Sequence, residues 1–183
     1  MALRATIYKA ELSVADLDRS YYADHALTLA RHPSETEERM MVRLLAFALN
    51  ADPALAFAAG LSTGDEPDLW RRDLTGAIEQ WIEVGLPDER VLRKAAGRAA
   101  AVTVYPYGGR KADVWWSQNA AALRRIDSLT VVAIDVPGPV ALADMAERTM
   151  RLSATIQDGQ VLLSSGDRGA TAITTTLLAA ADR

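Results

Sequence analysis

The sequence predicts an α/β domain with a mixed sheet flanked by helices, plus an additional antiparallel β element built from the N- and C-terminal segments. The first observation is that strand patterns alternate with helical patterns between residues 77 and 136. The second is the continuous apolar run at residues 129–136, LTVVAIDV, which is typical of a strand buried on both faces. The third is Asp158-Gly159 between two alternating runs, which indicates a hairpin.

The composition narrows the class of protein. The chain has 183 residues, half of them apolar, which fits one domain spanning residues 1–183 with a substantial core. Its net charge of −4 disfavours non-specific binding to polyanions, so a nucleic-acid role needs a local basic patch. The chain has no cysteine and therefore no disulfide or thiolate site. Because no apolar run is long enough for a signal or a span, we expect a soluble, cytoplasmic protein without a membrane partner.

The N-terminal part reads as two strands and a helix. Residues 3–14 alternate with one slip of phase, which suggests a bulge, and residues 22–30 form the second strand. Ser34 and Glu37 fit a capping box for a helix through residue 50. On that helix we expect Arg39 and Arg43 in solvent, opposite an apolar face. That face contains Met40, Met41, Leu44, Leu45, Ala48 and Leu49.

The middle of the chain reads as strands and helices in alternation. Residues 54–60 suggest a short strand, and residues 67–73 and 77–85 suggest a hairpin around Thr75-Gly76. Asp88 caps a predicted helix that ends near residue 100. A strand at 101–107, a helix at 113–126, the apolar strand and a helix at 138–149 follow. Two strands, 150–156 and 160–165, then flank the Asp-Gly turn, and we expect a loose alanine-rich tail.

Two acids on neighbouring predicted strands suggest a metal site. Asp68 follows Pro67 at the start of one strand, and Glu83 shares a face of the next strand with Glu79 and Trp81. Pairing of the strands would bring both carboxylates to one end of the sheet, where they would attract Mg²⁺ or Mn²⁺. Turn chemistry at Asp68 and a solvated face around Glu83 are the structural alternatives.

A third acid and a lysine complete the pattern. Glu38 borders the apolar face of the first helix, although stabilisation of the helix end by its charge also accounts for it. Lys94 borders the buried side of the helix after Glu83 and could reach back over the sheet edge, or lie in a solvated basic rim. Acid, acid and lysine are typical of metal-dependent phosphodiester cleavage.

A candidate nucleic-acid surface lies on the following helices. The segment DVWWSQN places two tryptophans and two amides on one helix, which suits base stacking, although one core and one half-covered tryptophan explain it as well. The residues selected for this surface are Arg90, Arg98, Arg110, Trp116 and Gln118. No P-loop, dinucleotide-binding or hydrolase-elbow motif is present, and the two histidines lack the spacing of a zinc site.

Four segments closely resemble the bacterial YaeQ family: RHPSETEERMMVRLLAF, DEPDLW, WIEVGLPDER and RTMRLSATIQDG. The resemblance covers nearly the whole chain. It implies a core similar to the PD-(D/E)XK nuclease-like superfamily, the restriction-endonuclease type, at about residues 34–148. The extra strands would then be at about 3–30 and 149–166. It also implies a link to transcription antitermination.

The superfamily pattern carries over unevenly. Asp68 matches the aspartate of the second core strand, Glu83 the acid of the third, and Glu38 the acid of the first helix. The lysine expected two residues after Glu83 is replaced by Gly85, and Lys94 resembles the relocated lysine of some branches. The resulting hypothesis is a metal-dependent phosphodiesterase that acts on DNA or RNA. The alternative is a non-catalytic module that binds nucleic acid or protein, including the transcription machinery.

Overall fold

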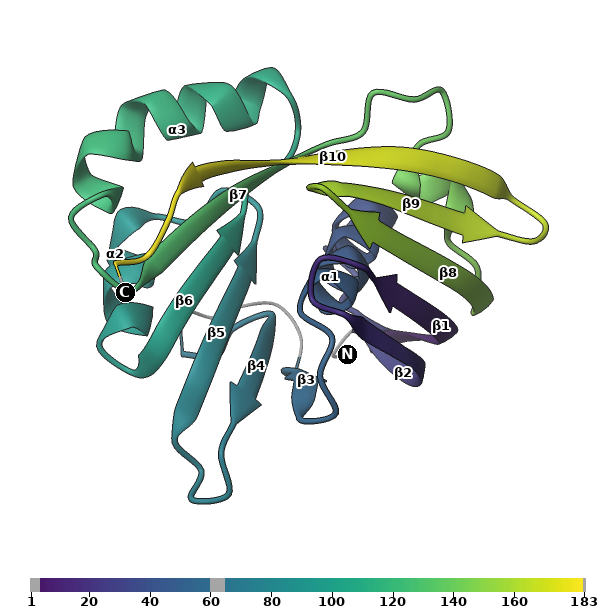
Figure 1. The fold of residues 1–183 in the computed structure, drawn as a ribbon, viewed down its shortest axis with the longest axis horizontal. Coiled ribbons are helices and arrows are strands. Elements are labelled where there is room, and N and C mark those ends of the chain that lie inside the picture. Colours follow the sequence, from purple (N-terminus) through teal and green to yellow (C-terminus); the bar gives the residue numbers. More distant parts are fainter. Residues whose placement is uncertain (1–3, 60–64, 183) are drawn as a thin grey trace. The chain divides into compact units, whose positions relative to one another are not determined.

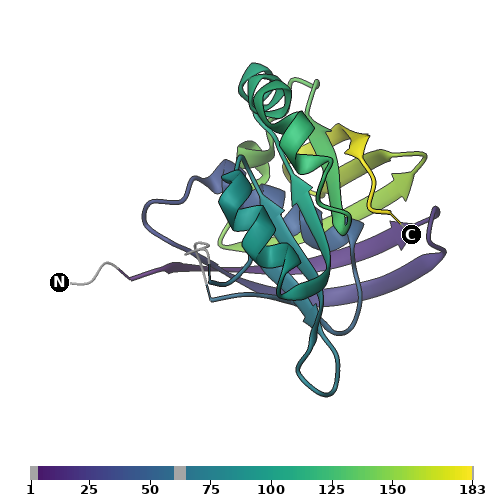
Figure 2. The ribbon, with the colours of Figure 1, turned by 90° about the vertical axis from the view of Figure 1, so that its left-hand side faces the viewer.

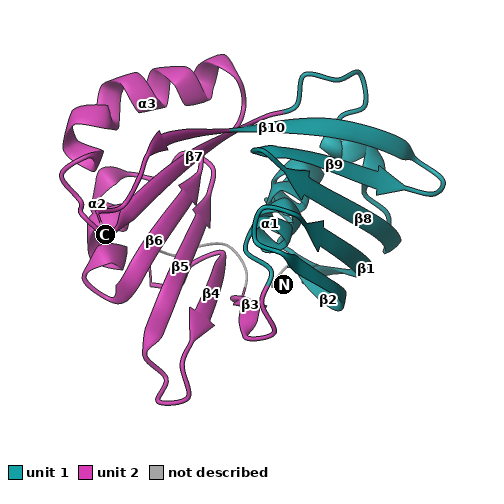
Figure 3. Ribbon diagram, in the orientation of Figure 1, with its two compact units in different colours: residues 1–51, 136–175 teal, residues 52–135, 176–183 magenta. Residues whose placement is uncertain are grey.

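The computed structural model describes residues 4–59 and 65–182, which form two compact units (Figure 3). Unit 1 combines the chain up to Ala51 with residues 136–175, and unit 2 combines residues 52–135 with the chain from Thr176. The predicted nuclease-like core, residues 34–148, therefore draws on both units. Within the described residues, none of the helices has the length and apolar character needed to cross a bilayer.

Unit 1 joins the N-terminal strands of the chain with strands from its C-terminal part in one sheet (Figure 1). Its strands follow the order β2-β1-β8-β9-β10, in which β1 and β8 are parallel and the other neighbours are antiparallel. The predicted element from the N- and C-terminal segments is therefore present, but it is not wholly antiparallel, because the ladder that joins the two segments is parallel. Its elements are β1 (Thr6–Asp16), β2 (Tyr21–Arg31), α1 (Glu37–Leu49), the 3₁₀ turn η1 (Leu142–Met145), β8 (Thr149–Gln157), β9 (Gln160–Ser165) and the first part of β10 (Gly169–Ala179).

The inner face of this sheet is apolar and packs against α1. Every second residue of β1 is buried, and the ring of His25 on β2 meets Phe47 of α1 edge-on at 5.0 Å. The predicted apolar face of α1 is buried except at its last residue, Leu49, which is half-buried. The predicted bulge in β1 is wrong, because the register with β2 runs unbroken from Thr6 to Asp16. Tyr8 rather than Ile7 faces the core, which restores a regular alternation.

The start of α1 differs from the prediction. Thr36 is the N-cap, with its hydroxyl accepting from the Arg39 N–H at 3.1 Å, so the capping box from Ser34 is wrong. Glu37 instead accepts a hydrogen bond from the hydroxyl of Tyr8. The helix begins two residues late because the intervening Glu35 is needed elsewhere: its carboxylate is buried against arginines of α1.

Two C-terminal predictions are also wrong. The helix predicted at 138–149 reduces to the single 3₁₀ turn η1, and residue 149 already begins β8. The tail is not loose, because β10 pairs with β9 from Gly169 to Thr174. The threonines and Ile173 of this segment favour a strand, but the segment becomes one only because β9 lies beside it as a hydrogen-bonding partner.

Unit 2 is a sheet with helices on one face. Strands β5, β6 and β7 are parallel neighbours, and β4 and β3 continue the sheet beside β5 as antiparallel strands. Helices α2 and α3 cover the same face (Figure 2), as consecutive right-handed crossovers require. The bounds are β3 (Leu55–Phe57), β4 (Leu69–Arg72), β5 (Ile78–Val84), α2 (Glu89–Ala96), β6 (Ala99–Tyr105), α3 (Arg110–Leu123) and β7 (Leu129–Asp135).

The core of unit 2 lies between this helix pair and the sheet. Its buried side chains come from β5, β6, β7, α2 and α3, and they include Trp81, Leu92, Val102, Val104, Trp115, Leu123 and Val131. The mixed α/β sheet predicted for the middle of the chain is therefore present. Helix α2 ends at Ala96, four residues before the prediction, because Ala99 already pairs in β6.

A buried ion pair holds the entrance of α1 in unit 1. Both guanidinium nitrogens of Arg43 that face Glu35 donate to its carboxylate at 2.8 Å, and each side chain is 2% exposed. Arg43 also donates to the Ala30 carbonyl, and Arg39 binds the same carboxylate from the rim. The expectation that Arg43 is solvated is therefore wrong, since an acid outside the helix neutralises its charge.

We predict that Glu35→Ala lowers the free energy of unfolding by about 3–5 kcal/mol, because it leaves a buried guanidinium without its partner. Urea denaturation followed by circular dichroism measures the change. The matched control is Arg151→Ala, which breaks the exposed pair with Glu11 and is expected to cost at most about 1 kcal/mol. A cost for Glu35→Ala no greater than for this control would contradict the account.

Candidate functional site

Asp68 is fully buried at the end of the β4–β5 ladder, with 0% of its surface exposed. Its backbone N–H donates to the Ile82 carbonyl at 3.0 Å, and its Oδ2 accepts from the Val84 N–H at 2.8 Å. The two bonds bracket Glu83 on β5. Antiparallel pairing of Leu69 with Ile82 explains the position, since Asp68 directly precedes Leu69. The sequence thus places Asp68 beside Glu83 through the predicted hairpin.

Glu83 is 2% exposed and lies on the helix-covered face of β5. Its Oε1 accepts a 2.8 Å hydrogen bond from the indole N–H of Trp81, two residues earlier on the same face. The alternative of a solvated face is therefore wrong for Glu83, although Glu79 further along the strand is exposed. The indole bond partly offsets the cost of burying a carboxylate.

The two carboxylates lie at the carboxyl end of the parallel strands β5 and β6, where α/β sheets commonly bind ligands. Their oxygens are the hard donors that Mg²⁺ and Mn²⁺ prefer. Among residues 4–59 and 65–182 no group of three or more His, Cys, Asp or Glu side chains is arranged to hold a metal ion. Two carboxylates nonetheless fit Mg²⁺, which commonly takes one or two and completes its shell with water and phosphate.

Glu38 belongs to the other unit. It lies in the first turn of α1 in unit 1 and is exposed, whereas Asp68 and Glu83 are buried in unit 2. The structure thus brings together two of the three predicted metal ligands within one unit. The exposed first-turn position also suits stabilisation of the helix end by a negative charge.

Lys94 contacts the segment that leads into Asp68. Its ammonium donates to the carboxylate of Asp65 at 2.5 Å, and Arg98 donates to the Asp65 carbonyl at 2.6 Å. The hydrogen bond from Lys94 and then its positive charge hold the pKa of Asp65 below its ordinary value, and the charge of Arg98 adds to this. Lys94 of α2 and Arg98, two residues beyond the end of that helix, therefore hold the segment that leads into β4 at the protein surface.

Position 85 has a backbone that disfavours the superfamily lysine. Gly85 has φ of +98°, a conformation that side chains with a Cβ rarely adopt. Its N–H donates to the Tyr105 carbonyl, so the turn is fixed by β6. An added Cβ would meet Tyr107 only at 3.9 Å, an ordinary contact. The backbone angle, and not a lack of space, accounts for glycine at this position.

The predicted nucleic-acid residues lie on α2 and α3. Arg90, Arg110 and Gln118 are exposed, and Arg98 stacks 5.2 Å from the ring centre of the buried Trp81. Trp116 is half-buried beneath Arg124, at 5.2 Å. Its neighbour Trp115 is a core residue whose indole donates to the Pro87 carbonyl. The pair therefore consists of one core tryptophan and one half-covered tryptophan, which is the alternative to base stacking that the sequence also allowed.

Sequence reasoning missed Trp70 and Arg72. The guanidinium of Arg72 lies 3.6 Å from the ring centre of Trp70, and Trp70 meets Trp81 edge-on at 6.4 Å. The strand period carries part of the signal, because Asp68 and Trp70 are two residues apart and so share a face. The register with β5 shifts between Arg71 and Arg72, so the contact with the ring, and not the period, places Arg72 on this face.

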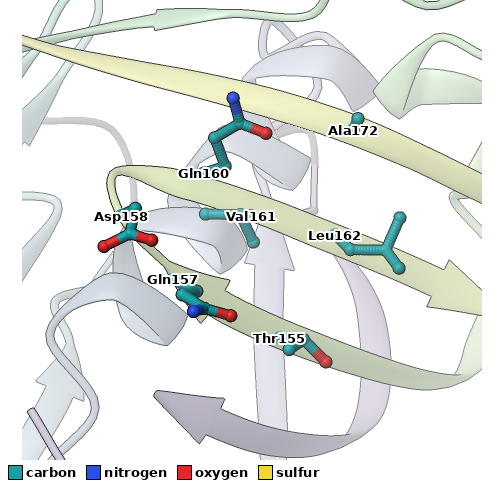
Figure 4. A pocket seen from close by; sticks show the side chains of 7 residues that line it. All are labelled: Thr155, Gln157, Asp158, Gln160, Val161, Leu162 and Ala172. Atoms are coloured by element: carbon teal, nitrogen blue, oxygen red, sulfur yellow. The ribbon is translucent and has the colours of Figure 1, made fainter. Parts of the chain in front are cut away.

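An open hollow in unit 1 lies apart from these residues (Figure 4). It measures about 550 Å³ and lies over β8, β9 and β10. Its lining is Thr155, Gln157, Asp158, Gln160, Val161, Leu162 and Ala172. Because this lining has a single carboxylate and no cation, it lacks the paired groups of a catalytic site.

Comparison with known proteins identifies the family. The sequence profile of the family described as YaeQ protein matches residues 1–174. The chain belongs to the YaeQ family. The uncharacterised YaeQ proteins of Salmonella typhi and Escherichia coli K12 are each 51% identical over 164 residues, which are 90% of this chain and 91% of theirs.

The YaeQ fold is also found in two solved relatives. The crystal structure of YaeQ from Xanthomonas axonopodis pv. citri matches with a TM-score of 0.91 at 48% identity, over 96% of this chain and 99% of that one. YaeQ from Pseudomonas syringae matches with a TM-score of 0.87 at 37% identity, over 96% and 97%. The α/β architecture described above is thus shared within the YaeQ family.

We predict that Gly85→Ala in this YaeQ chain lowers the free energy of unfolding by about 1–2 kcal/mol, the cost of a left-handed backbone for a residue with a Cβ. Gly97→Ala is the control, because Gly97 ends α2 with φ of −77° and has room for a Cβ. Denaturant titration measures both. Equal stability of the two variants would contradict a backbone role for Gly85.

Proposed function

We propose that the protein is a divalent-metal-dependent phosphodiesterase with a nuclease-like core, acting on nucleic acid, and that Asp68 and Glu83 bind Mg²⁺ or Mn²⁺. The observation that carries the proposal is the burial of both carboxylates, at 0% and 2% exposure, at one end of the β4–β5 pair, where Asp68 accepts a hydrogen bond from the backbone directly after Glu83. Buried acids of this kind are costly unless paired, protonated or bound to a metal.

The surrounding hydrogen bonds support this role. Metal-binding carboxylates are commonly held by hydrogen-bond donors that fix the orientation of their oxygens. The Val84 N–H performs this task for Asp68, and the Trp81 indole performs it for Glu83. When bound, the ion would supply an activated water and stabilise charge on the phosphate.

The basic side chains on and near α2 and at the start of α3 are proposed to act on the segment before Asp68 and on the phosphates. Lys94 and Arg98 hold the Asp65 end of the segment that places Asp68. We propose that the ammonium of Lys94 also neutralises negative charge that develops on the phosphate. Arg90 and Arg110, both exposed, would contact the phosphates of the polymer.

A second function is favoured by specific observations. Position 85 carries no lysine for a backbone reason, and the ammonium of Lys94 already binds Asp65. Both facts suit a non-catalytic module that binds nucleic acid or a protein of the transcription machinery with the same fold. Such a module would bind with its carboxylates acting only as structural hydrogen-bond acceptors.

The test is thermal melting with EDTA and with millimolar Mn²⁺. An ion bound only by the native state at a hundred times its dissociation constant adds about 2.7 kcal/mol, so we predict a raised Tm for the wild type. Glu83→Gln keeps the shape of the side chain and removes its charge, and we predict that it abolishes the rise.

Glu79→Gln is the matched control, because Glu79 lies on the same strand but is exposed and bound to Arg71. We expect this variant to keep the full response to Mn²⁺. A wild type that does not respond to Mn²⁺, together with a Glu83→Gln variant less stable than wild type in EDTA, would make Glu83 a structural acid. The binding-module function would then replace the phosphodiesterase.

A further inference from the structure

We propose that Trp70 and Arg72 form a stacking site for an unpaired base of a single-stranded nucleic acid, an inference that deepens the proposed function and rests on it for the class of polymer. The site occupies the face of β4 that begins at the buried Asp68. It would bind the polymer beside the candidate metal site, separately from the surface of α3 that contains Trp116.

The first step is the geometry of the side chains. Arg72 lies 3.6 Å from the centre of the Trp70 ring, which is a full stacking contact of a flat cation on an aromatic surface. Trp70 meets Trp81 edge-on, and Arg98 lies over Trp81 at 5.2 Å. Cations therefore cover two linked indoles, one of which is buried. An aromatic platform beside arginines is the combination that binds single strands without sequence preference.

The second step is access to the ring. Trp81 is fully buried, whereas Trp70 is half-buried and Arg72 is exposed. The residue opposite Trp70 on β3 is Ala56, whose methyl group is too small to cover an indole, and β3 ends one residue later. Arg72 lies over the ring, and it is a flexible side chain that a base can displace or stack upon.

The third step is the position of the ring along the strand. Two residues of a strand span about 7 Å, so Trp70 lies a short distance from Asp68 on the same strand face. A nucleotide stacked on Trp70 would carry its phosphate toward the buried carboxylates and the cations of α2. In a duplex the flat surface of each base is covered by its neighbours, so this site selects unpaired bases.

The experiment measures binding without metal. A fluorescein-labelled oligothymidylate is titrated with the full-length protein in EDTA at low ionic strength, and fluorescence anisotropy reports the dissociation constant. We expect Trp70→Ala to weaken binding about tenfold and Trp70→Phe to retain most of it. Arg72→Lys keeps the positive charge but removes the planar guanidinium, so we expect it to weaken binding through the loss of stacking. Tyr22→Ala is the control, because Tyr22 is a 65% exposed aromatic on β2 of unit 1.

The outcomes separate this inference from the proposed function. If binding depends on Trp70 and the Tm does not change with Mn²⁺, the stacking site is supported and the proposed phosphodiesterase function is rejected. A protein that responds to Mn²⁺ but binds the oligonucleotide equally well with and without Trp70 overturns the stacking site alone. Competition by duplex as effective as by single strand also overturns it, as does equal weakening by Tyr22→Ala. Thermal melting of each variant confirms that it is folded.

Discussion

The burial of two carboxylates at one end of the β4–β5 ladder is the constraint on which the candidate site depends. Asp68 replaces a ladder bond by accepting from Val84, and Glu83 accepts from the indole of Trp81. The bond between Asp68 and Val84 requires the pairing of Leu69 with Ile82, whereas the bond to Glu83 lies within β5 and depends on an indole that is held by the α2–α3 core. The positions of the two acids therefore depend both on the register of the β4–β5 hairpin and on the packing of the helices. A group so costly to bury points to a role beyond stability.

The same region differs at one position from the nuclease pattern that the resemblance implies. Position 85, where that pattern has a lysine, has a glycine backbone, and two basic groups further along the chain, Lys94 on α2 and Arg98 just after it, bind the Asp65 segment. Lys94 affects Asp68 indirectly, because it binds Asp65 on the segment before β4. A lysine at position 85 would act directly, through its own charge. The same fold suits a catalytic protein and a binding module, so the chemistry of the two carboxylates and the basic groups near them, and not the architecture, distinguishes the two functions.

Local periodicity predicted the parts of the structure that depend on near neighbours. The alternation in β5 placed Trp81 and Glu83 on one face, and the spacing around Thr75-Gly76 predicted the pairing that brings Asp68 to Glu83. The parts that failed depend on distant partners. Ser34 and Thr36 are both good caps, and only the ion pair of Glu35 with Arg43 selects Thr36. The C-terminal strand β10 likewise needed β9 as its template, and the φ angle of Gly85 is set by its bond to Tyr105.

The most direct measurement is a crystal structure grown with Mn²⁺, with diffraction recorded so that manganese scatters anomalously. The account predicts an anomalous peak bound by carboxylate oxygens of both Asp68 and Glu83, at about 2.0–2.4 Å as for hard cations with oxygen ligands. It also predicts that the bonds from Val84 and Trp81 persist behind the bound oxygens. Well-ordered carboxylates with no peak between them, in crystals where manganese is found elsewhere on the protein, would contradict the central claim.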